Sequence, residues 1–146
     1  MTDLASGRPV GAPRAPATVM VVDDSYEMLG LIGAWLQDEG YLVVTAASGM
    51  QALDAAETHE PDIVLLDVII PAPDGFAVCE TLQRHERPPE IILMTGVADP
   101  TRLRRVDDLG GLVLLRKPLT SEVVVDAVAA AVARRAARGV HKVSAR

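Results

Sequence analysis

Short apolar runs alternate with longer amphipathic segments along the chain from residue 17 onward. Each run has four or five residues and is rich in Val, Ile or Leu, which is typical of strands buried on both faces of a sheet. The five runs are Thr18–Val22, Tyr41–Thr45, Ile63–Leu66, Ile91–Met94 and Leu112–Leu115. We therefore expect five strands.

Apolar residues at helical spacing predict a helix after each of these runs. The first four helices are expected over residues 25–39, 48–59, 75–86 and 99–109. The last should begin after Thr120, whose side chain can cap it, with Glu122 in its first turn. Five such units predict an α/β fold in which a doubly wound parallel sheet has helices on both faces.

The two ends of the chain differ in composition from this central part. Residues 1–16 are rich in Gly, Pro and Ala without a period that could bury a face, so we expect a flexible leader. One domain is expected over residues 17–139, followed by a basic tail over residues 140–146. No apolar run reaches the roughly 18 residues of a membrane span or the length of a signal peptide, which predicts a cytoplasmic protein. The single cysteine, Cys79, fits that compartment and is expected to be a small buried hydrophobe.

Charge is distributed unevenly along the chain. The net charge is −6, but residues 1–16 carry +1 and residues 134–146 carry +5, which leaves −12 on residues 17–133. An acidic body argues against direct binding of nucleic acid, since nucleic-acid-binding domains normally present a basic face. The cations at 134–146 are typical of a solvated helix end and a frayed tail, with partner binding as the alternative.

Polar residues follow four of the five apolar runs, where the predicted strands end. Asp23 and Asp24 follow the first run, Asp67 the third, Thr95 the fourth and Lys117 the fifth. Because the carboxyl ends of parallel strands share one edge, where ligands bind, these side chains form a candidate site. In the strand order 2-1-3-4-5, the first and third strands are neighbours about 4.8 Å apart, and the three carboxylates come together.

Three carboxylates this close together require a bound cation or a retained proton. Ligands that are all oxygen favour Mg²⁺. A carboxylate beside Mg²⁺ and a lysine is suited to accept a phosphoryl group, with Asp67 as nucleophile and Lys117 offsetting charge on the transferring oxygens. Thr95 can donate a hydrogen bond to the attached group.

Each of these residues also has a simpler explanation when taken alone. Asp24 or Ser25 could cap the following helix. Lys117 could be a surface lysine, and Thr95 an ordinary strand residue. The Asp-Gly pair at 74–75 is more typical of a turn than of a ligand. The histidines lack neighbours at metal-ligand spacing, so the sequence predicts no zinc site.

Four short segments resemble the signature blocks of response-regulator receiver domains from bacterial two-component signalling. They are VVDDS at 21–25, LLDVIIPAPDG at 65–75, ILMTG at 92–96 and RKP at 116–118. One block alone is weak evidence, whereas four in order, each closing a predicted strand, are specific. The resemblance runs from Thr18 to Arg138 and implies the flavodoxin-like receiver fold, a five-stranded sheet in the order 2-1-3-4-5.

The resemblance also implies a role for each residue of the candidate site. Asp67 would be the phosphoacceptor, Thr95 the switch hydroxyl and Lys117 the phosphate-binding lysine. Pro118 would follow a cis peptide bond. The ligands of Mg²⁺ or Mn²⁺ would be Asp23, Asp24, Asp67 and the backbone carbonyl of Ile69.

Two positions depart from the family pattern. Three residues before the lysine, where many members have Tyr or Phe, this chain has Leu114. After Pro118 it has Leu119, where Phe is common in the family. The usual aromatic switch therefore lacks its residue, and we expect a muted conformational change without loss of phosphorylation.

The resemblance implies a signalling switch rather than an enzyme that acts on outside substrates. A sensor histidine kinase or a phosphotransfer protein would donate the phosphoryl group to Asp67, and a downstream effector protein would read it. The chain is expected to act alone or as a fragment of a longer regulator or hybrid kinase, and a homodimer is left open.

Two other classes of protein share parts of this pattern. An aspartyl phosphatase or mutase often has a second acid two residues after its nucleophile, where this chain has Ile69. A flavodoxin-like cofactor binder would need a phosphate cradle rich in Ser, Thr and Gly, which the loops lack. Both classes fit the sequence less well.

Overall fold

The computed structural model describes residues 16–96, 99–110 and 112–144. Over these residues, strands and helices alternate strictly, and the strands form one parallel sheet in the order β2-β1-β3-β4-β5. The strands are β1 (Thr18–Val22), β2 (Leu42–Ala46), β3 (Ile63–Asp67), β4 (Glu90–Thr95) and β5 (Val113–Arg116). The helices are α1 (Tyr26–Asp38), α2 (Gly49–His59), α3 (Gly75–Gln83), α4 (Pro100–Asp108) and α5 (Ser121–Ser144). The predicted α/β fold and its strand order are confirmed.

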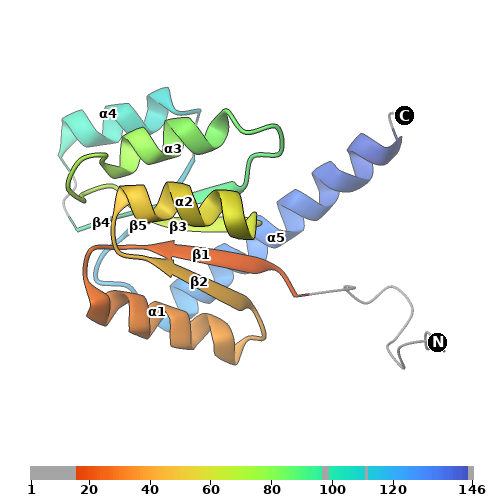
Figure 1. The fold of residues 1–146 in the computed structure, drawn as a ribbon, viewed down its shortest axis with the longest axis horizontal. Helices are drawn as coiled ribbons and strands as arrows, with labels where there is room; N and C mark the ends of the chain where they lie inside the picture. Colours follow the sequence, from red (N-terminus) through yellow and green to blue (C-terminus); the bar gives the residue numbers. More distant parts are fainter. Residues whose placement is uncertain (1–15, 97–98, 111, 145–146) are drawn as a thin grey trace.

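Helices cover both faces of the sheet, with α2, α3 and α4 on one face and α1 and α5 on the other (Figure 1). Each face has its own apolar cluster, because successive residues of a strand point to opposite faces. Met20 and Val22 of β1 belong to the cluster under α2 and α3, whereas Val19 and Val21 belong to the cluster over α1 and α5. The core therefore consists of two layers separated by the sheet.

Only the three central strands are buried on both faces. Every residue of β3 and β4 is buried, and so is β1 except for Thr18. In the edge strand β2, Leu42 is 56% exposed, and no residue of β5 is fully buried. The expectation of burial on both faces is thus met only in part for β2 and β5: their side chains pack against both apolar clusters but are mostly half-buried, because the helices cover the edges of the sheet less completely than its centre.

Local signals set the ends of the helices. The Thr120 hydroxyl accepts a hydrogen bond from the Val123 N–H at 3.2 Å, so Thr120 caps α5 as predicted. α3 ends at Gln83 instead of 86, and α5 continues to Ser144, so it includes most of the segment assigned to a basic tail. Within the part of the chain described here, no helix is both long and apolar enough to cross a membrane.

The arginines in the second half of α5 are bound to acids of the sheet. Arg138 and Arg134 lie 2.7 and 3.7 Å from the carboxylate of Glu90, which begins β4 and is only 9% exposed. Arg135 lies 3.4 Å from the carboxylate of Asp62, just before β3. Arg134 and Arg138 remain exposed, as expected of a solvated helix, and Arg135 is partly buried, but all three form ion pairs that the sequence did not predict. A nearly buried carboxylate needs a charge partner, and α5 supplies it.

Cys79 lies in the core on α3 and is fully buried. Burial raises the pKa of its thiol to about 11, with a smaller contribution from the charge of Glu80. The thiol is therefore protonated at neutral pH, and Cys79 is the small buried hydrophobe that its neighbours in the sequence predict.

Candidate functional site

Backbone hydrogen bonds hold the ends of the strands level at one edge of the sheet. The N–H of Asp23, one residue beyond β1, donates to β2 at 3.2 Å, and the N–H of Lys117, one residue beyond β5, donates to the carbonyl of Thr95 at 2.8 Å. Asp67 ends β3 and is in register with Met94 of β4. The residues predicted to follow the strands therefore all lie at the carboxyl edge of the sheet.

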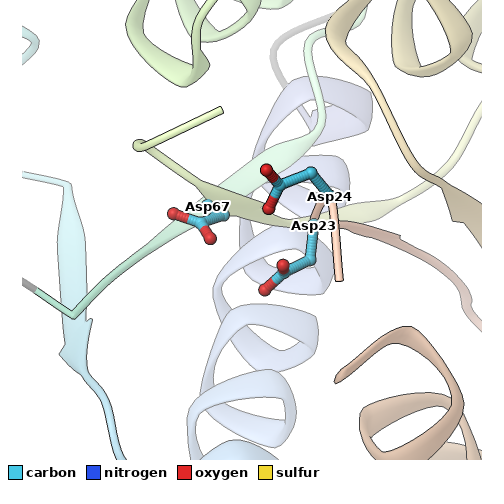
Figure 2. Close-up of side chains that lie close together, drawn as sticks. All are labelled: Asp23, Asp24 and Asp67. Atoms are coloured by element: carbon cyan, nitrogen blue, oxygen red, sulfur yellow. The ribbon is translucent and has the colours of Figure 1, made fainter. Parts of the chain in front are cut away.

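The three aspartates of the candidate site come together at this edge (Figure 2). One carboxylate oxygen from each of Asp23, Asp24 and Asp67 lies within 4.8 Å of the other two. Asp23 and Asp67 are only 1% and 4% exposed, whereas Asp24 is exposed to solvent. The predicted cluster of three carboxylates is present, because β1 and β3 are adjacent strands.

Lys117 joins two of these carboxylates. Its Nζ lies 2.9 Å from Oδ2 of Asp67 and 2.7 Å from Oδ2 of Asp23. The contact with Asp67 agrees with the reach expected of a long side chain two strands away. The contact with Asp23 was not predicted, and it means that a single ammonium group serves both buried acids.

Backbone N–H groups orient the same two acids. The N–H of Ser25 donates to Oδ1 of Asp23 at 2.9 Å, and the N–H of Ile69 donates to Oδ1 of Asp67 at 2.9 Å. Each bond spans two residues, so a local turn fixes each carboxylate. The Ser25 hydroxyl accepts from the Met28 N–H at 3.2 Å and is the cap of α1. The capping role thus belongs to Ser25, and Asp24 contributes its carboxylate to the cluster.

The loop after Asp67 folds back onto the backbone of the same residue. A Cβ atom on Gly75 would lie 2.3 Å from the carbonyl oxygen of Asp67 and 2.4 Å from Cα of Val68, so only glycine fits there. Asp74 caps α3, since its Oδ1 accepts a hydrogen bond from the Ala77 N–H at 2.9 Å. The Asp-Gly pair, expected to form a turn, therefore begins α3.

The remaining predicted residues border the cluster. Thr95 ends β4 and is 3% exposed, and Ile69 stands at the rim with 37% of its surface exposed. The peptide bond between Lys117 and Pro118 is cis, as the resemblance implies. The hydroxyl of Thr95 as a phosphoryl ligand and the carbonyl of Ile69 as a metal ligand stay predictions.

Burial sets the electrostatics of the site. It raises the pKa of Asp67, and the nearby charge of Asp23 raises it further, although hydrogen bonds from Lys117 and from the Ile69 N–H act in the opposite direction. Partial burial lowers the pKa of Lys117, but its hydrogen bonds to Asp23 and Asp67 outweigh burial, so this pKa is raised overall. Ionisation of Asp67 is therefore less favourable in the protein without a cation than in a free carboxyl group.

The donor atoms at this edge fit a hard divalent cation. They are carboxylate oxygens, and one of the three acids is exposed, which leaves room for the waters that Mg²⁺ retains. A cation would also relieve the unfavourable charge of Asp67, which a single lysine does not. The chemistry of the donor set thus supports the predicted preference for Mg²⁺ or Mn²⁺.

We expect Asp67→Asn to stabilise the metal-free protein at neutral pH, by on the order of 1 kcal/mol, as other single stabilising changes do. The pKa of Asp67 in the folded state lies above its ordinary value of 3.8, so the folded state loses stability as the pH rises through the folded pKa. The gain should therefore shrink in acid and vanish below a pH of about 3.8.

Chemical denaturation of both proteins in the presence of a chelator, at a series of pH values, checks this prediction. Adding Mg²⁺ should stabilise the parent by binding to its folded state and reduce the difference between the two proteins. A variant that is less stable than the parent at neutral pH without metal would contradict it.

Comparison with known proteins identifies the family and the fold of this chain. The chain matches the response regulator receiver domain family over residues 19–129, which includes Asp23, Asp24, Asp67, Thr95 and Lys117. The chain belongs to this family. Members of the family are signalling proteins and not conventional enzymes.

Relatives of this receiver domain include proteins of Bacillus subtilis and Halobacterium salinarum. It is 33% identical to the sporulation initiation phosphotransferase F of Bacillus subtilis over 110 aligned residues. The aligned region covers 75% of this chain and 89% of that protein. It is 26% identical to the chemotaxis protein CheY of Halobacterium salinarum, over 75% of this chain and 92% of the relative. With the transcriptional regulatory protein YxdJ of Bacillus subtilis it shares 31% identity, but the match spans only 46% of that longer protein.

Solved structures give the same result for the receiver fold. The chemotaxis protein CheY4 of Vibrio cholerae superimposes with a TM-score of 0.73 at 29% identity, over 80% of this chain and 99% of that one. The signal receiver domain of a histidine kinase from Syntrophus aciditrophicus superimposes with a TM-score of 0.74, over 80% of this chain and 90% of that one. That second pair is 24% identical, and it supports the fold alone.

Proposed function

We propose that this receiver domain accepts a phosphoryl group on Asp67 from a sensor histidine kinase or a phosphotransfer protein. The observation that carries the proposal is the meeting of three carboxylates and one ammonium group at the carboxyl edge of the sheet. Mg²⁺ or Mn²⁺ would be held by Asp23, Asp24, Asp67 and the backbone carbonyl of Ile69. We keep the expectation of a cytoplasmic location.

Each residue of the site has a distinct task in this reaction. An oxygen of Asp67 attacks phosphorus as the bond between phosphorus and the donor breaks, so the transferred group becomes an acyl phosphate. The bound divalent cation supplies charge neutralisation to the phosphoryl oxygens. Lys117 adds a second positive charge beside Asp67, and the hydroxyl of Thr95 donates a hydrogen bond to the attached group.

Exposed apolar side chains around the site favour a protein donor. Tyr26, Met50 and Val123 lie in the first turns of α1, α2 and α5 and are 78%, 57% and 46% exposed, and Ile69 is 37% exposed. All four lie at the carboxyl edge of the sheet, where the helices begin. Large apolar side chains around a polar centre are typical of a surface that docks another protein. After transfer, a downstream effector protein would read the phosphorylated form.

We expect a small phosphodonor to add one phosphoryl group per chain in the presence of Mg²⁺ and none in its absence. Without a cation, the donor's negative charge meets an acidic site with only Lys117 to offset it. Intact-mass spectrometry after treatment with a phosphoramidate salt, with Mg²⁺ or with a chelator, measures the number of groups added.

A phosphomonoester offered in excess separates the proposal from an aspartyl phosphatase. The receiver should leave the ester intact, because its own product is a single acyl phosphate and Ile69 supplies no second acid. Release of many phosphates per chain from the ester would refute the proposed function.

A further inference from the structure

A cleft of about 460 Å³ opens beside the loop that follows Asp67. One wall is the loop itself and the start of α3, including Ile69, Asp74 and Phe76. The other wall is the first two turns of α4, including Arg102 and Arg105. The cleft therefore lies between α4 and the loop that follows the phosphoacceptor Asp67.

Arg105 bridges the two walls of this cleft. Its guanidinium carbon lies 4.1 Å from the centroid of the Phe76 ring, and its Nη1 lies 3.9 Å from Oδ2 of Asp74. Phe76 is only 3% exposed, so the arginine covers an aromatic face that would otherwise border the cleft. The Arg105 side chain itself is 48% exposed, so the contact has the strength of a cation over a ring at the surface, about 0.5–1 kcal/mol.

α4 has few other attachments to the domain. Val106 is its only buried residue. Arg102 pairs with Asp99, the N-cap of the same helix, so this ion pair does not connect α4 to the rest of the domain. The contact of Arg105 with Phe76 and Asp74 joins the middle of α4 to the start of α3. At the other end of α4, the Gln83 side chain donates to the carbonyl of Leu109, the C-cap, at 3.3 Å. A helix with so little buried surface opens more readily than the rest of the fold.

The segment that Arg105 holds is in direct contact with Asp67. Gly75, which lies between Asp74 and Phe76, packs against the carbonyl of Asp67 without room for a Cβ atom. The N–H of Ile69 donates to Oδ1 of Asp67. Attaching a group to this carboxylate changes the charge of the acceptor of that hydrogen bond, and Ile69 begins the loop that ends at Asp74 and Phe76.

Leu114 occupies the position where many family members have the aromatic residue of the conformational switch, and it cannot play that part. It is partly buried against the same apolar cluster as Phe76 and Val106, and it has no polar group to exchange between buried and exposed positions. Phe76 is the only phenylalanine of the chain, and it sits under Arg105. The aromatic residue beside α4 therefore comes from the start of α3 and not from β5.

We propose that Arg105 is a positioning residue through which phosphorylation of Asp67 fastens α4 against the start of α3. The proposal rests on the proposed function, since it needs Asp67 to be the acceptor. The attached phosphoryl group orders the loop that carries Asp74 and Phe76, so the contact of Arg105 with these residues breaks less often. α4 then separates less often from the start of α3. The surface of α4 presented to an effector thus depends on the state of Asp67.

Hydrogen exchange of α4 amides, with and without beryllofluoride and Mg²⁺ as a phosphoryl analogue, tests this coupling. In the parent, the analogue should slow exchange in α4. In Arg105→Ala, exchange should already be about 2- to 5-fold faster without the analogue, the factor that corresponds to one such cation–ring contact. Adding the analogue to this variant should change α4 little, while exchange near Asp67 slows as in the parent.

Two further variants separate coupling from a general loss of structure. Arg104→Ala changes the neighbouring exposed arginine in the same way and should behave like the parent. Arg105→Lys keeps a cation at the position and should restore part of the response of α4. If α4 in Arg105→Ala slows as much as in the parent, Arg105 carries no coupling. If beryllofluoride leaves the surroundings of Asp67 unchanged in the parent, the proposed function itself is wrong.

Discussion

Replacing Asp67 by Asn should abolish phosphorylation by a small phosphodonor, the largest effect expected from any single substitution in this receiver domain. The amide has no anionic oxygen to attack phosphorus, whereas it keeps the size of the carboxylate. Its single oxygen can still accept one of the two hydrogen bonds, from the Ile69 N–H or from Lys117. The variant should therefore fold, and its intact mass should stay unchanged after treatment with donor and Mg²⁺.

Asp24→Asn is the matched control for this loss. Asp24 is the exposed member of the cluster, so its substitution removes the charge of one proposed metal ligand without touching the nucleophile. We expect this variant to be labelled fully, but at an Mg²⁺ concentration about 10-fold higher, in line with the usual cost of disturbing a metal site. Equal labelling of Asp67→Asn and the parent would show that another residue accepts the phosphoryl group.

The candidate site could be predicted from the sequence because it depends on the ends of strands. In a parallel sheet, the residue after each apolar run must reach the same edge. The strand order 2-1-3-4-5, which the family resemblance implies, then makes the strands ending at Val22 and Leu66 neighbours and brings Asp23 and Asp67 together. The caps are local, since Thr120 lies three residues from the N–H that it accepts from, and they need no knowledge of the rest of the fold.

The features that the sequence did not predict join residues far apart in the chain. Arg138 reaches Glu90 across the end of the sheet, and the charge of that arginine alone was equally compatible with a solvated helix. Lys117 also binds Asp23, 94 positions away, which depends on the distance across β1, β3 and β4. The contact of Arg105 with Phe76 depends on where α4 lies over α3. Periodicity carries no information about any of these distances.

The second large effect concerns how long the phosphorylated form survives. Hydrolysis requires a water in line with the bond between Asp67 and phosphorus, and a polar side chain beside the site can hold that water. The two positions expected from the resemblance to flank this approach are Ile69 and Val97. Val97 lies outside the described residues, whereas Ile69 borders the site at the rim, 37% exposed, with its N–H on the Asp67 carboxylate. Its side chain is a hydrocarbon that cannot orient water.

Ile69→Asn should therefore speed the loss of the phosphoryl group by about 10-fold, which corresponds to about 1.4 kcal/mol of barrier. The position is partly exposed, so the fold should tolerate the amide, and acquisition of the group should be unimpaired because the backbone N–H of residue 69 remains. The measurement is decay of the phosphorylated protein after donor removal, with kinase absent. The phosphorylated form of Ile69→Leu, which keeps a hydrocarbon side chain, should decay at the rate of the parent. Adding Val97→Glu to Ile69→Asn should not slow the loss of the phosphoryl group. A parent that decays as fast as Ile69→Asn would mean that water reaches the acyl phosphate without help from this side chain, and that the lifetime is set elsewhere in the site.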